Sequence, residues 1–194
     1  MKRQLVFATH NQNKWKEIQA LLPLDIRLLS LTDIGCDNPI PEYGKTVEDN
    51  AWIKADFVKQ NYGMDCFADD TGLEVEALGN TPGVFSARYA GEAASATENM
   101  DKLLANLKGQ QNRKACFRTV IAMYFANQKK TFEGVVSGEI LTEKQGYFGF
   151  GYDPIFRADG MLKSFASLTL EQKNQISHRK RAFSQMVYFL NTLT

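Results

Sequence analysis

The sequence contains few histidines and no nucleotide-binding glycine fingerprint of the dinucleotide type. Its only histidines, His10 and His178, are too few and too far apart for the His/Cys spacing of a zinc site. A Ser-His-Asp or Cys-His catalytic group is disfavoured for the same reason, and the GxGxxG pattern is absent. Covalent catalysis and zinc chemistry are therefore disfavoured.

Cysteines are also scarce, and no long apolar segment is present. Cys36, Cys66 and Cys116 are odd in number, widely spaced, and set in apolar or turn-like surroundings. Such cysteines fit reduced thiols better than a disulfide framework. The N-terminal apolar run stops after Ala8, which is too short for a secretory signal or a membrane span. We therefore expect a cytoplasmic protein with no membrane partner.

An excess of charge of either sign is lacking too. The 23 basic and 22 acidic residues leave a formal charge of +1, so no global field favours stable binding of nucleic acid. Any anion must be bound by local groups. The 194 residues, of which 44% are hydrophobic, can bury one core or two modest lobes. Without repeats or linkers, we expect a single domain over residues 1–194.

Strand and helix patterns alternate in the first half of the chain. An apolar run over residues 5–8 predicts a strand, and the helical spacing of residues 15, 18, 21 and 22 predicts a helix that Pro23 stops. Residues 26–31 could form a second strand. A longer helix is predicted from an N-cap at Thr46 to Gly63, with Asn50 and Lys54 on a face separate from its apolar stripe.

The second half is richer in strand patterns. A brief strand over residues 66–68 is expected to end at Asp69, and residues 73–77 alternate as in a half-buried strand. Thr97 could cap a helix that Gly109 closes. Residues 115–125 and 131–141 predict a hairpin, and residues 183–190 carry the stripe of a last helix. The pattern predicts an α/β fold with a mixed central sheet flanked by helices.

The first candidate site is the polar stretch between the first strand and the first helix. The N–H groups and positive dipole end of a helix suit a phosphate, and a lysine in the first turn adds a full charge. Polar residues at this place can also be mere connectors, and Lys54 could be an ordinary solvated lysine. The candidate residues of the stretch are Thr9, His10, Asn11, Gln12, Asn13 and Lys14.

The second candidate is the acidic pair Asp69-Asp70. Several carboxylate oxygens in one place select a hard cation such as Mg²⁺, and Glu42 or Glu74 could join them. The Asp-Thr-Gly sequence that follows would also suit a turn, and at this point both interpretations stand.

The third candidate is the aromatic, glycine-containing loop at residues 148–154. Aromatic faces allow stacking and the glycines let a flat ring approach the backbone, although such mixtures also occur in ordinary turns. Asp153 could bind a base or a ribose. Lys173 and the run from Ser177 to Arg181 could form a cationic recognition site or a solvated helix start.

Taken in order, these segments resemble the inosine triphosphate pyrophosphatase family, also called dITP/XTP pyrophosphatases. The matching sequences are ATHNQNK, EDNA with Lys54, ADDTGLEV, PGVFSARYAG, FGYDPIF and ISHR, and they span nearly the whole chain. Two departures are His10, where the family more usually has glycine, and the extra Asp49 within Glu-Asn-Ala.

The resemblance implies an elongated α/β protein with two lobes around an active-site cleft, assembled as a homodimer. It places phosphate binding on residues 9–14 and Lys54, and metal and base roles on Glu42 and Asp70, with Asp69 beside them. Catalysis is thus expected from Asp70, Asp69, Lys14 and Lys54. Substrate contacts are further expected at Thr71 and, for the nucleobase and ribose, at Phe150, Gly151, Tyr152, Asp153, Lys173, His178 and Arg179.

The activity that the resemblance implies is Mg²⁺-dependent hydrolysis of dITP, ITP, XTP and dXTP to the nucleoside monophosphate and pyrophosphate. Hypoxanthine and xanthine carry an oxygen acceptor at position six, where adenine carries an amino donor, so Arg179 or His178 would favour the former. Modified pyrimidine triphosphates are an alternative substrate class. A nucleotide-sensing or RNA-binding module is a further alternative, which the acidic pair disfavours.

Overall fold

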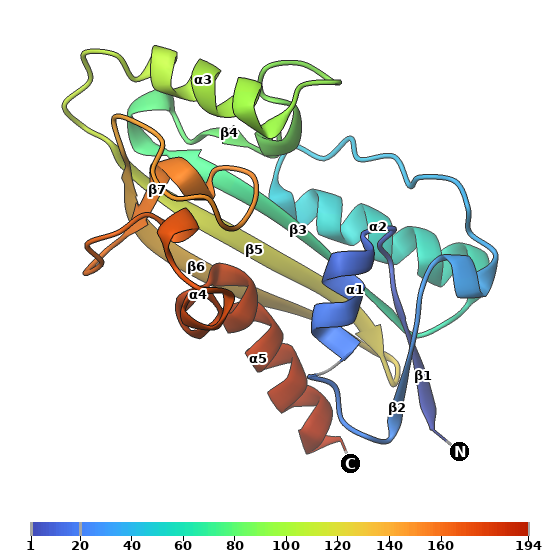
Figure 1. Ribbon diagram of the computed structural model, residues 1–194. Helices are drawn as coiled ribbons and strands as arrows, with labels where there is room; N and C mark the ends of the chain where they lie inside the picture. The colour runs from blue at the N-terminus through green and yellow to red at the C-terminus, as the bar shows by residue number, and fades with distance from the viewer. Residues whose placement is uncertain (1, 20, 194) are drawn as a thin grey trace. The chain divides into compact units, whose positions relative to one another are not determined.

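The computed structural model describes residues 2–19 and 21–193, without the side chains of residues 12, 13, 16, 17, 170 and 174 (Figure 1). The α-helices of this part are α1 (Gln12–Gln19), α2 (Val47–Tyr62), α3 (Ala96–Asn106), α4 (Leu170–Ile176) and α5 (His178–Thr192). The strands are β1 (Arg3–Phe7), β2 (Ile26–Leu29), β3 (Cys66–Val75), β4 (Thr81–Gly83), β5 (Lys114–Phe125), β6 (Gln128–Ile140) and β7 (Phe156–Ala158). None of the described helices combines the length and apolar character needed to cross a bilayer.

The strands form one mixed sheet in the order β2-β1-β3-β5-β6-β7, with β4 paired to β3. β1 pairs in parallel with β2 and with β3, whereas β4 on β3 and β7 on β6 are antiparallel. Parallel neighbours need a crossover, which α1 supplies between β1 and β2 and α2 supplies before β3. The α/β class with a mixed sheet is confirmed.

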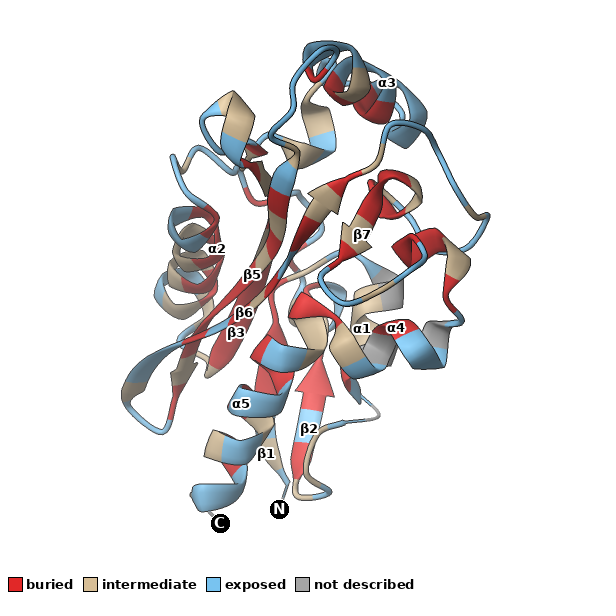
Figure 2. Cartoon of the chain, turned by 90° about the vertical axis from the view of Figure 1, so that its left-hand side faces the viewer, coloured by how far each residue is buried: buried red, intermediate tan, exposed pale blue. Residues whose placement is uncertain are grey.

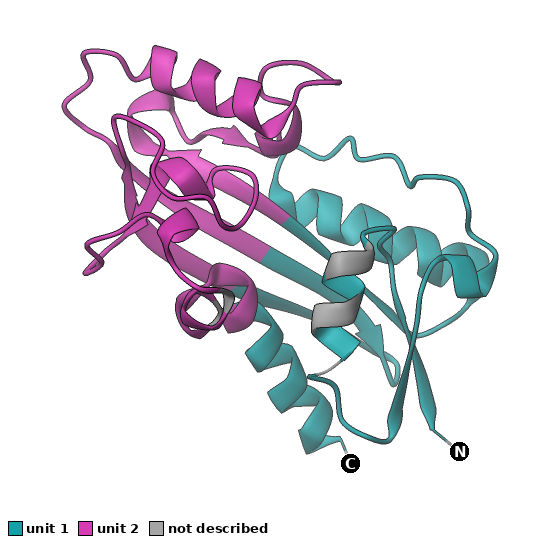
Figure 3. Cartoon of the chain, in the orientation of Figure 1, with its two compact units in different colours: residues 1–70, 120–133, 182–194 teal, residues 71–119, 134–181 magenta. Residues whose placement is uncertain are grey.

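The chain divides into two compact units (Figure 3). Unit 1 comprises residues 1–70, 120–133 and 182–194, and unit 2 comprises residues 71–119 and 134–181. Three strands, β3, β5 and β6, contribute residues to both units. The single domain over residues 1–194 stays a prediction.

Unit 1 buries both faces of its strands. On one face Phe7 of β1 and Phe67 of β3 stack with ring centroids 4.4 Å apart, and the ring of Phe183 in α5 meets both edge-on. On the other face the Cys66 thiol donates to the carbonyl of Ala55 in α2, 3.3 Å away. The buried part of α2 is red in Figure 2 and includes Val47, Ala51, Ala55 and Val58.

Unit 2 has an aromatic core of its own. Phe117 of β5 packs against Phe156 of β7, with centroids 4.7 Å apart, and lies parallel to Phe165 at 6.1 Å. Leu103 and Leu107 from the α3 region belong to the same buried cluster. These contacts fix the position of Phe117, on which the His178 ring stacks.

Helix ends follow local side-chain chemistry. The Thr46 hydroxyl accepts from the Asp49 N–H while the Asp49 carboxylate accepts from the Thr46 N–H, and Gly63 ends α2 at φ 67°, as predicted. The prediction that Thr97 caps the next helix was wrong. Ser95 caps α3 because Glu98, three residues later, completes a capping box.

Two strand boundaries differ from those expected. The hairpin turn contains only Ala126 and Asn127, at φ 49° and 60°, so β6 already begins at Gln128. Two-residue turns with positive φ match the twist of the flanking strands. The expectation that a strand ends at Asp69 was also wrong. β3 continues through the acidic pair to Val75, where it pairs with β4.

Candidate functional site

Asp69 and Asp70 lie within β3, so their side chains point to opposite faces. Side chains alternate along a strand. Phe67, two residues before Asp69, faces Phe183 of α5, whereas Cys66 faces α2. Asp69 therefore shares the face covered by α1 and α5, and Asp70 shares the face covered by α2. The two carboxylates have different partners as a result.

Asp69 pairs with Lys14 of α1. The Lys14 ammonium donates to both carboxylate oxygens of Asp69, at 2.9 and 2.8 Å. The Asp69 side chain is only 1% exposed and that of Lys14 is 20% exposed. β1 pairs in parallel with β3 only up to Phe67, so Asp69 lies just beyond the carboxyl end of β1, where α1 begins. This edge is where open α/β sheets place ligands.

Asp70 lies among side chains of α2. One carboxylate oxygen accepts a hydrogen bond from the Asn50 amide at 3.2 Å, and the other lies 3.8 Å from the Lys54 ammonium. Lys54 also donates to a carboxylate oxygen of Glu42 at 2.6 Å and to the backbone carbonyl of Asp69 at 2.8 Å. The Asn50–Lys54 spacing, one helical turn, brings both to the same carboxylate.

The Lys54 ammonium is held in the charged form. Burial alone would lower the pKa of this group, but the opposing charges of Asp70, Asp69 and Glu42 outweigh burial and raise the pKa above its usual value. Lys54 therefore supplies a permanent positive charge near neutral pH. The interpretation of Lys54 as an ordinary solvated lysine is wrong, because the residue is buried and its ammonium is paired.

The segment between β1 and α1 is arranged as a helix start. The Asn11 side-chain oxygen accepts the Lys14 N–H at 3.1 Å, and the Thr9 hydroxyl accepts the Asn11 N–H at 3.1 Å. His10 is exposed, and its Nε2 lies 3.2 Å from the carbonyl of Asn38. The side chains of Gln12 and Asn13 lie outside the described residues. Thr9 and Asn11 thus shape the loop that presents the N-terminus of α1.

The charges of this region can be compared with the needs of a hard cation. Glu42, Asp69 and Asp70 supply three carboxylates against two ammonium groups, Lys14 and Lys54, which leaves one negative charge in excess. No group of three or more His, Cys, Asp or Glu side chains suited to a metal is found among the described residues. Mg²⁺ commonly takes only one or two carboxylates, with water and phosphate completing its shell. Glu42 and Asp70, which flank one ammonium, fit that donor set.

A second cluster lies in unit 2 around Phe150. The Phe150 ring is 63% exposed. The Lys173 ammonium lies 4.7 Å from the ring centroid, and the Arg179 guanidinium carbon lies 5.5 Å from it. Cations on an aromatic face are attracted by the ring quadrupole, and they also donate hydrogen bonds. An exposed ring with two cations beside it can stack a flat anionic ligand or a base.

Asp153 fixes the loop that carries Phe150. Its carboxylate accepts from the Phe150 N–H at 2.9 Å and forms an ion pair with Lys173, and both charged side chains are buried. A side chain at Gly149 would lie 2.1 Å from the Asp153 carboxylate, so only glycine fits there. Gly151, at φ 62°, completes the turn. The structure therefore gives Asp153 a loop-positioning contact.

Tyr152 lies apart from this exposed face. Its side chain is 4% exposed, its hydroxyl donates to the Ser86 carbonyl at 2.8 Å, and its ring belongs to the core of unit 2. Burial raises the pKa of the Tyr152 hydroxyl. Ser86 in turn binds the N–H of Leu73, at 2.8 Å. Tyr152 thus ties its loop to the start of the second unit, rather than presenting its ring to a ligand.

Thr71 and His178 are joined by a residue that sequence reasoning missed. The hydroxyls of Thr71 and Thr119 lie 2.8 Å apart, and the Thr119 hydroxyl lies 2.6 Å from Nδ1 of His178. Thr119 is fully buried in β5 and carries no signal in the sequence, because only strand pairing brings it beside Thr71. Asn50 was also missed, although its helix face was recognised.

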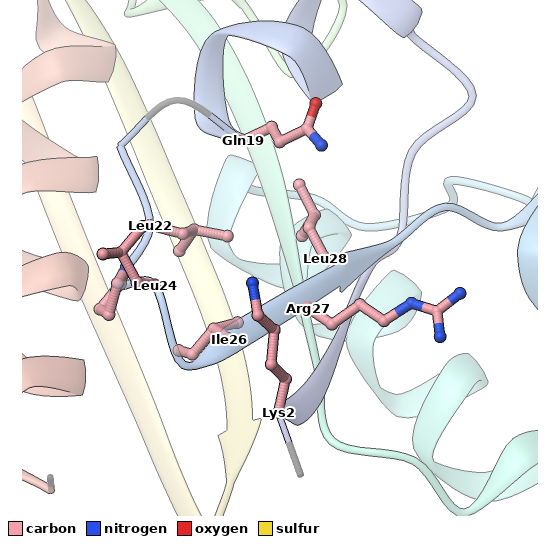
Figure 4. Close-up of a pocket in the computed structure, with 8 residues that line it drawn as sticks. Lys2, Gln19, Leu22, Leu24, Ile26, Arg27 and Leu28 are labelled. Atoms are coloured by element: carbon pink, nitrogen blue, oxygen red, sulfur yellow. The ribbon is translucent and has the colours of Figure 1, made fainter.

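A cavity of about 320 Å³ lies elsewhere, in unit 1 (Figure 4). Its wall combines leucine and isoleucine side chains with two cations and contains none of the predicted site residues. It is lined by Lys2, Gln19, Leu22, Pro23, Leu24, Ile26, Arg27 and Leu28.

Comparison with known proteins gives a consistent picture. The sequence model described as the Ham1 family matches residues 5–189. A protein of Christiangramia forsetii named dITP/XTP pyrophosphatase is 52% identical over 188 residues, which cover 97% of this chain and 99% of that protein. A protein of Flavobacterium psychrophilum with the same name is 53% identical and covers 96% of this chain and 98% of its own length.

Solved structures also superpose on nearly the whole chain. The Ham1 protein of Staphylococcus aureus superposes with a TM-score of 0.94 at 40% identity, over 99% of this chain and all of that one. A nucleoside-triphosphatase / dITP/XTP pyrophosphatase from Mycobacterium abscessus superposes with a TM-score of 0.83 at 38% identity, over 95% and 98% of the two chains.

Proposed function

Because the match covers almost its whole length, this chain belongs to the Ham1 family, and we propose that it hydrolyses dITP, ITP, XTP and dXTP to the nucleoside monophosphate and pyrophosphate. The names of its relatives support this reaction. The observation that carries the proposal is the buried Lys54 ammonium, which Glu42 and Asp70 flank and the Asp69 carbonyl binds.

Charge neutralisation is the main task of such a site. In the reaction a water oxygen bonds to the α-phosphorus, the bond from that phosphorus to the bridging oxygen breaks, and pyrophosphate leaves with the electron pair. Negative charge then grows on the leaving group and on the phosphoryl oxygens. We assign its stabilisation to Lys14, Lys54 and the N-terminus of α1. Each lysine would donate to a phosphate oxygen when substrate binds.

Asp70 is the residue that we assign to the attacking water. Its carboxylate is 16% exposed, so water can reach it, whereas the Asp69 carboxylate is closed off by burial and by Lys14. Asp70 would orient the water or take its proton. Asp69 would act by holding Lys14 in place.

We propose Mg²⁺ as the cofactor, held by Glu42 and Asp70. When bound, it would neutralise charge on the triphosphate and position it. The excess of one carboxylate over the ammonium groups supports this choice.

Base recognition is assigned to unit 2. Phe150 would stack on the purine, and His178 or Arg179 would donate to its six-position oxygen. Arg offers donors only, so the amino group of adenine would leave a donor facing a donor, at a cost of about 1–3 kcal/mol for buried groups. Assembly as a homodimer and a cytoplasmic location stay predictions, the first of which light scattering would test.

A substrate panel tests the proposal. Pure protein would be incubated with dITP, ITP, XTP and the four common triphosphates, with and without Mg²⁺, and the products identified. We expect monophosphate and pyrophosphate from dITP, ITP and XTP only when Mg²⁺ is present, with ATP much slower. Comparable kcat/KM on ATP and ITP would contradict the base assignment, and release of orthophosphate would contradict the reaction.

A further inference from the structure

The Thr119 hydroxyl occupies the middle of a chain of three polar groups. It lies 2.8 Å from the Thr71 hydroxyl and 2.6 Å from Nδ1 of His178, and its residue is 0% exposed. All three residues belong to unit 2. A hydroxyl carries a single proton, so Thr119 can donate to only one of these two partners and must accept from the other.

This proton count allows two arrangements. In the first, Thr71 donates to Thr119, Thr119 donates to Nδ1, and a neutral His178 carries its proton on Nε2. In the second, Nδ1 carries the proton and donates to Thr119, which donates to Thr71. The hydrogen bond at one ring nitrogen therefore decides the state of the other. Nε2 is a donor in the first arrangement and an acceptor in the second.

The plane of the His178 ring is fixed independently of its proton. The ring stacks on Phe117 at 4.9 Å between centroids, with 22° between the planes, and Phe117 is held by Phe156 and Phe165. His178 is also the first residue of α5, and Arg179, Lys180 and Arg181 follow it. The positive helix end disfavours a further positive charge on the ring. In a neutral ring, the tautomer is coupled to the direction in which the Thr119 hydroxyl donates.

We propose that Thr119 is the positioning residue that holds His178 with its proton on Nε2, as a hydrogen-bond donor for a six-position oxygen. The inference rests on the proposed function and deepens it, because it gives base selectivity a physical origin outside the binding surface. A purine with an oxygen acceptor matches this tautomer. An amino donor at the same position meets another donor and is rejected.

The tautomer can be measured without any substrate. The chain has only two histidines, so a protein labelled with ¹⁵N-histidine gives two imidazole spin systems. A His10→Gln variant would assign them. We expect the long-range ¹H–¹⁵N pattern of His178 to show a protonated Nε2 and an unprotonated Nδ1. A protonated Nδ1 with an unprotonated Nε2, or a ring protonated on both nitrogens at neutral pH, would overturn the inference.

Two substitutions test the consequence. Thr119→Val keeps the shape and strand preference but removes the hydroxyl, whereas Thr119→Ser keeps the hydroxyl. We expect Thr119→Val to give a mixed tautomer signal and to lower the ratio of kcat/KM for ITP over ATP by roughly tenfold, the worth of one mismatched hydrogen bond. Thr119→Ser should restore both readouts. Thr131→Val, on the exposed part of β6, controls for the general effect of the exchange.

The outcomes separate this inference from the proposed function. A loss of total activity with an unchanged ITP/ATP ratio and an unchanged tautomer in Thr119→Val would overturn the role of Thr119 as a positioning residue. If the unaltered protein releases no pyrophosphate from any nucleotide, the proposed function fails, yet the spectrum still decides which tautomer Thr119 imposes.

Discussion

Asp69 and Asp70 are neighbours in β3, yet one carboxylate binds Lys14 on the α1 face and the other binds Asn50 on the α2 face. A turn could have brought the two acids to a single point. The strand instead separates a buried, fully paired carboxylate from one that water can reach. The two residues should therefore respond differently to the same substitution.

Asp70→Asn should nearly abolish turnover while leaving the fold intact. The amide keeps the shape and can still accept from Asn50, but it cannot take a proton or bind a cation with equal strength. We expect kcat to fall by about 10²- to 10⁴-fold, the range for loss of a general base, measured by pyrophosphate release. Asp25→Asn, which alters an ion pair with Arg3 outside the site, is the control. Full turnover of Asp70→Asn with normal unfolding would disprove its role.

Lys14→Met should destabilise the protein, because it leaves the 1% exposed Asp69 carboxylate without its ammonium partner. Breaking a buried pair from one side costs about 3–5 kcal/mol, and the partial exposure of Lys14 places the expectation at or below the lower end. Adding Asp69→Asn should recover part of that loss in urea unfolding. Additive effects of the two substitutions would show that the pair contributes no coupling energy.

Gly44→Ala should lower both stability and activity, because the added carbon would also lie 2.8 Å from the Asn50 backbone nitrogen at the start of α2. A side chain at Gly44 would lie 2.6 Å from the Asn50 side-chain oxygen, which accepts the Gly44 N–H. The exchange would displace Asn50 from Asp70 and move the loop that carries Glu42, and a shift of about 1 Å can cost about 100-fold in rate.

Gly63→Ala, at the other end of α2, is the matched control for Gly44→Ala. Its φ of 67° makes alanine strained, but nothing lies within 4 Å of the added carbon. We expect it to lose about 1–2 kcal/mol of stability and to keep its kcat. Equal activities of the two variants would contradict the contact from Gly44 to Asn50 as a determinant of the site.

Ionisation of the buried Cys66 thiol should lower the unfolding free energy as the pH rises in the alkaline range. Burial raises the pKa of this thiol to about 12, from 9.0 in an exposed chain. The pKa of this thiol is higher in the folded than in the unfolded protein. The stability that the protonated thiol contributes is therefore fully present below pH 9.0, and it is lost as the pH rises from 9.0 to about 12. In this window one proton changes the unfolding free energy by about 1.4 kcal/mol per pH unit. Cys66→Ala should unfold with a shallower pH dependence, and identical slopes would refute the assignment.

How much of this could be foreseen depends on whether the signal was local. The Thr46 cap, the Gly63 end and the shared face of Asn50 and Lys54 follow from residues within one or two helical turns, and all three are confirmed. The burial of Tyr152 does not follow from its neighbours, because Ser86, its hydrogen-bond partner, is 66 residues away.

The acidic pair and Thr119 show the same limit. An Asp-Asp-Thr-Gly sequence fits a turn in isolation, but here it is extended as part of β3, which lies between β1 and β5 in the sheet. Distant lysines and an asparagine satisfy its carboxylates. Thr119 lies 48 residues from Thr71 and 59 from His178, so only the pairing of strands reveals it.

Phe150→Ala should weaken substrate binding, whereas Phe148→Ala should not. The two rings are in the same loop and are similarly exposed, at 63% and 65%, but Lys173 and Arg179 lie at the ring of Phe150. Stacking on a base is worth about 1–3 kcal/mol, so the KM for ITP should rise about tenfold in Phe150→Ala with a smaller change in kcat. Phe150→Tyr, which keeps a ring, should stay near the original KM. Equal increases in KM in Phe148→Ala and Phe150→Ala would instead mean that the conformation of the loop, and not the Phe150 ring, determines substrate binding.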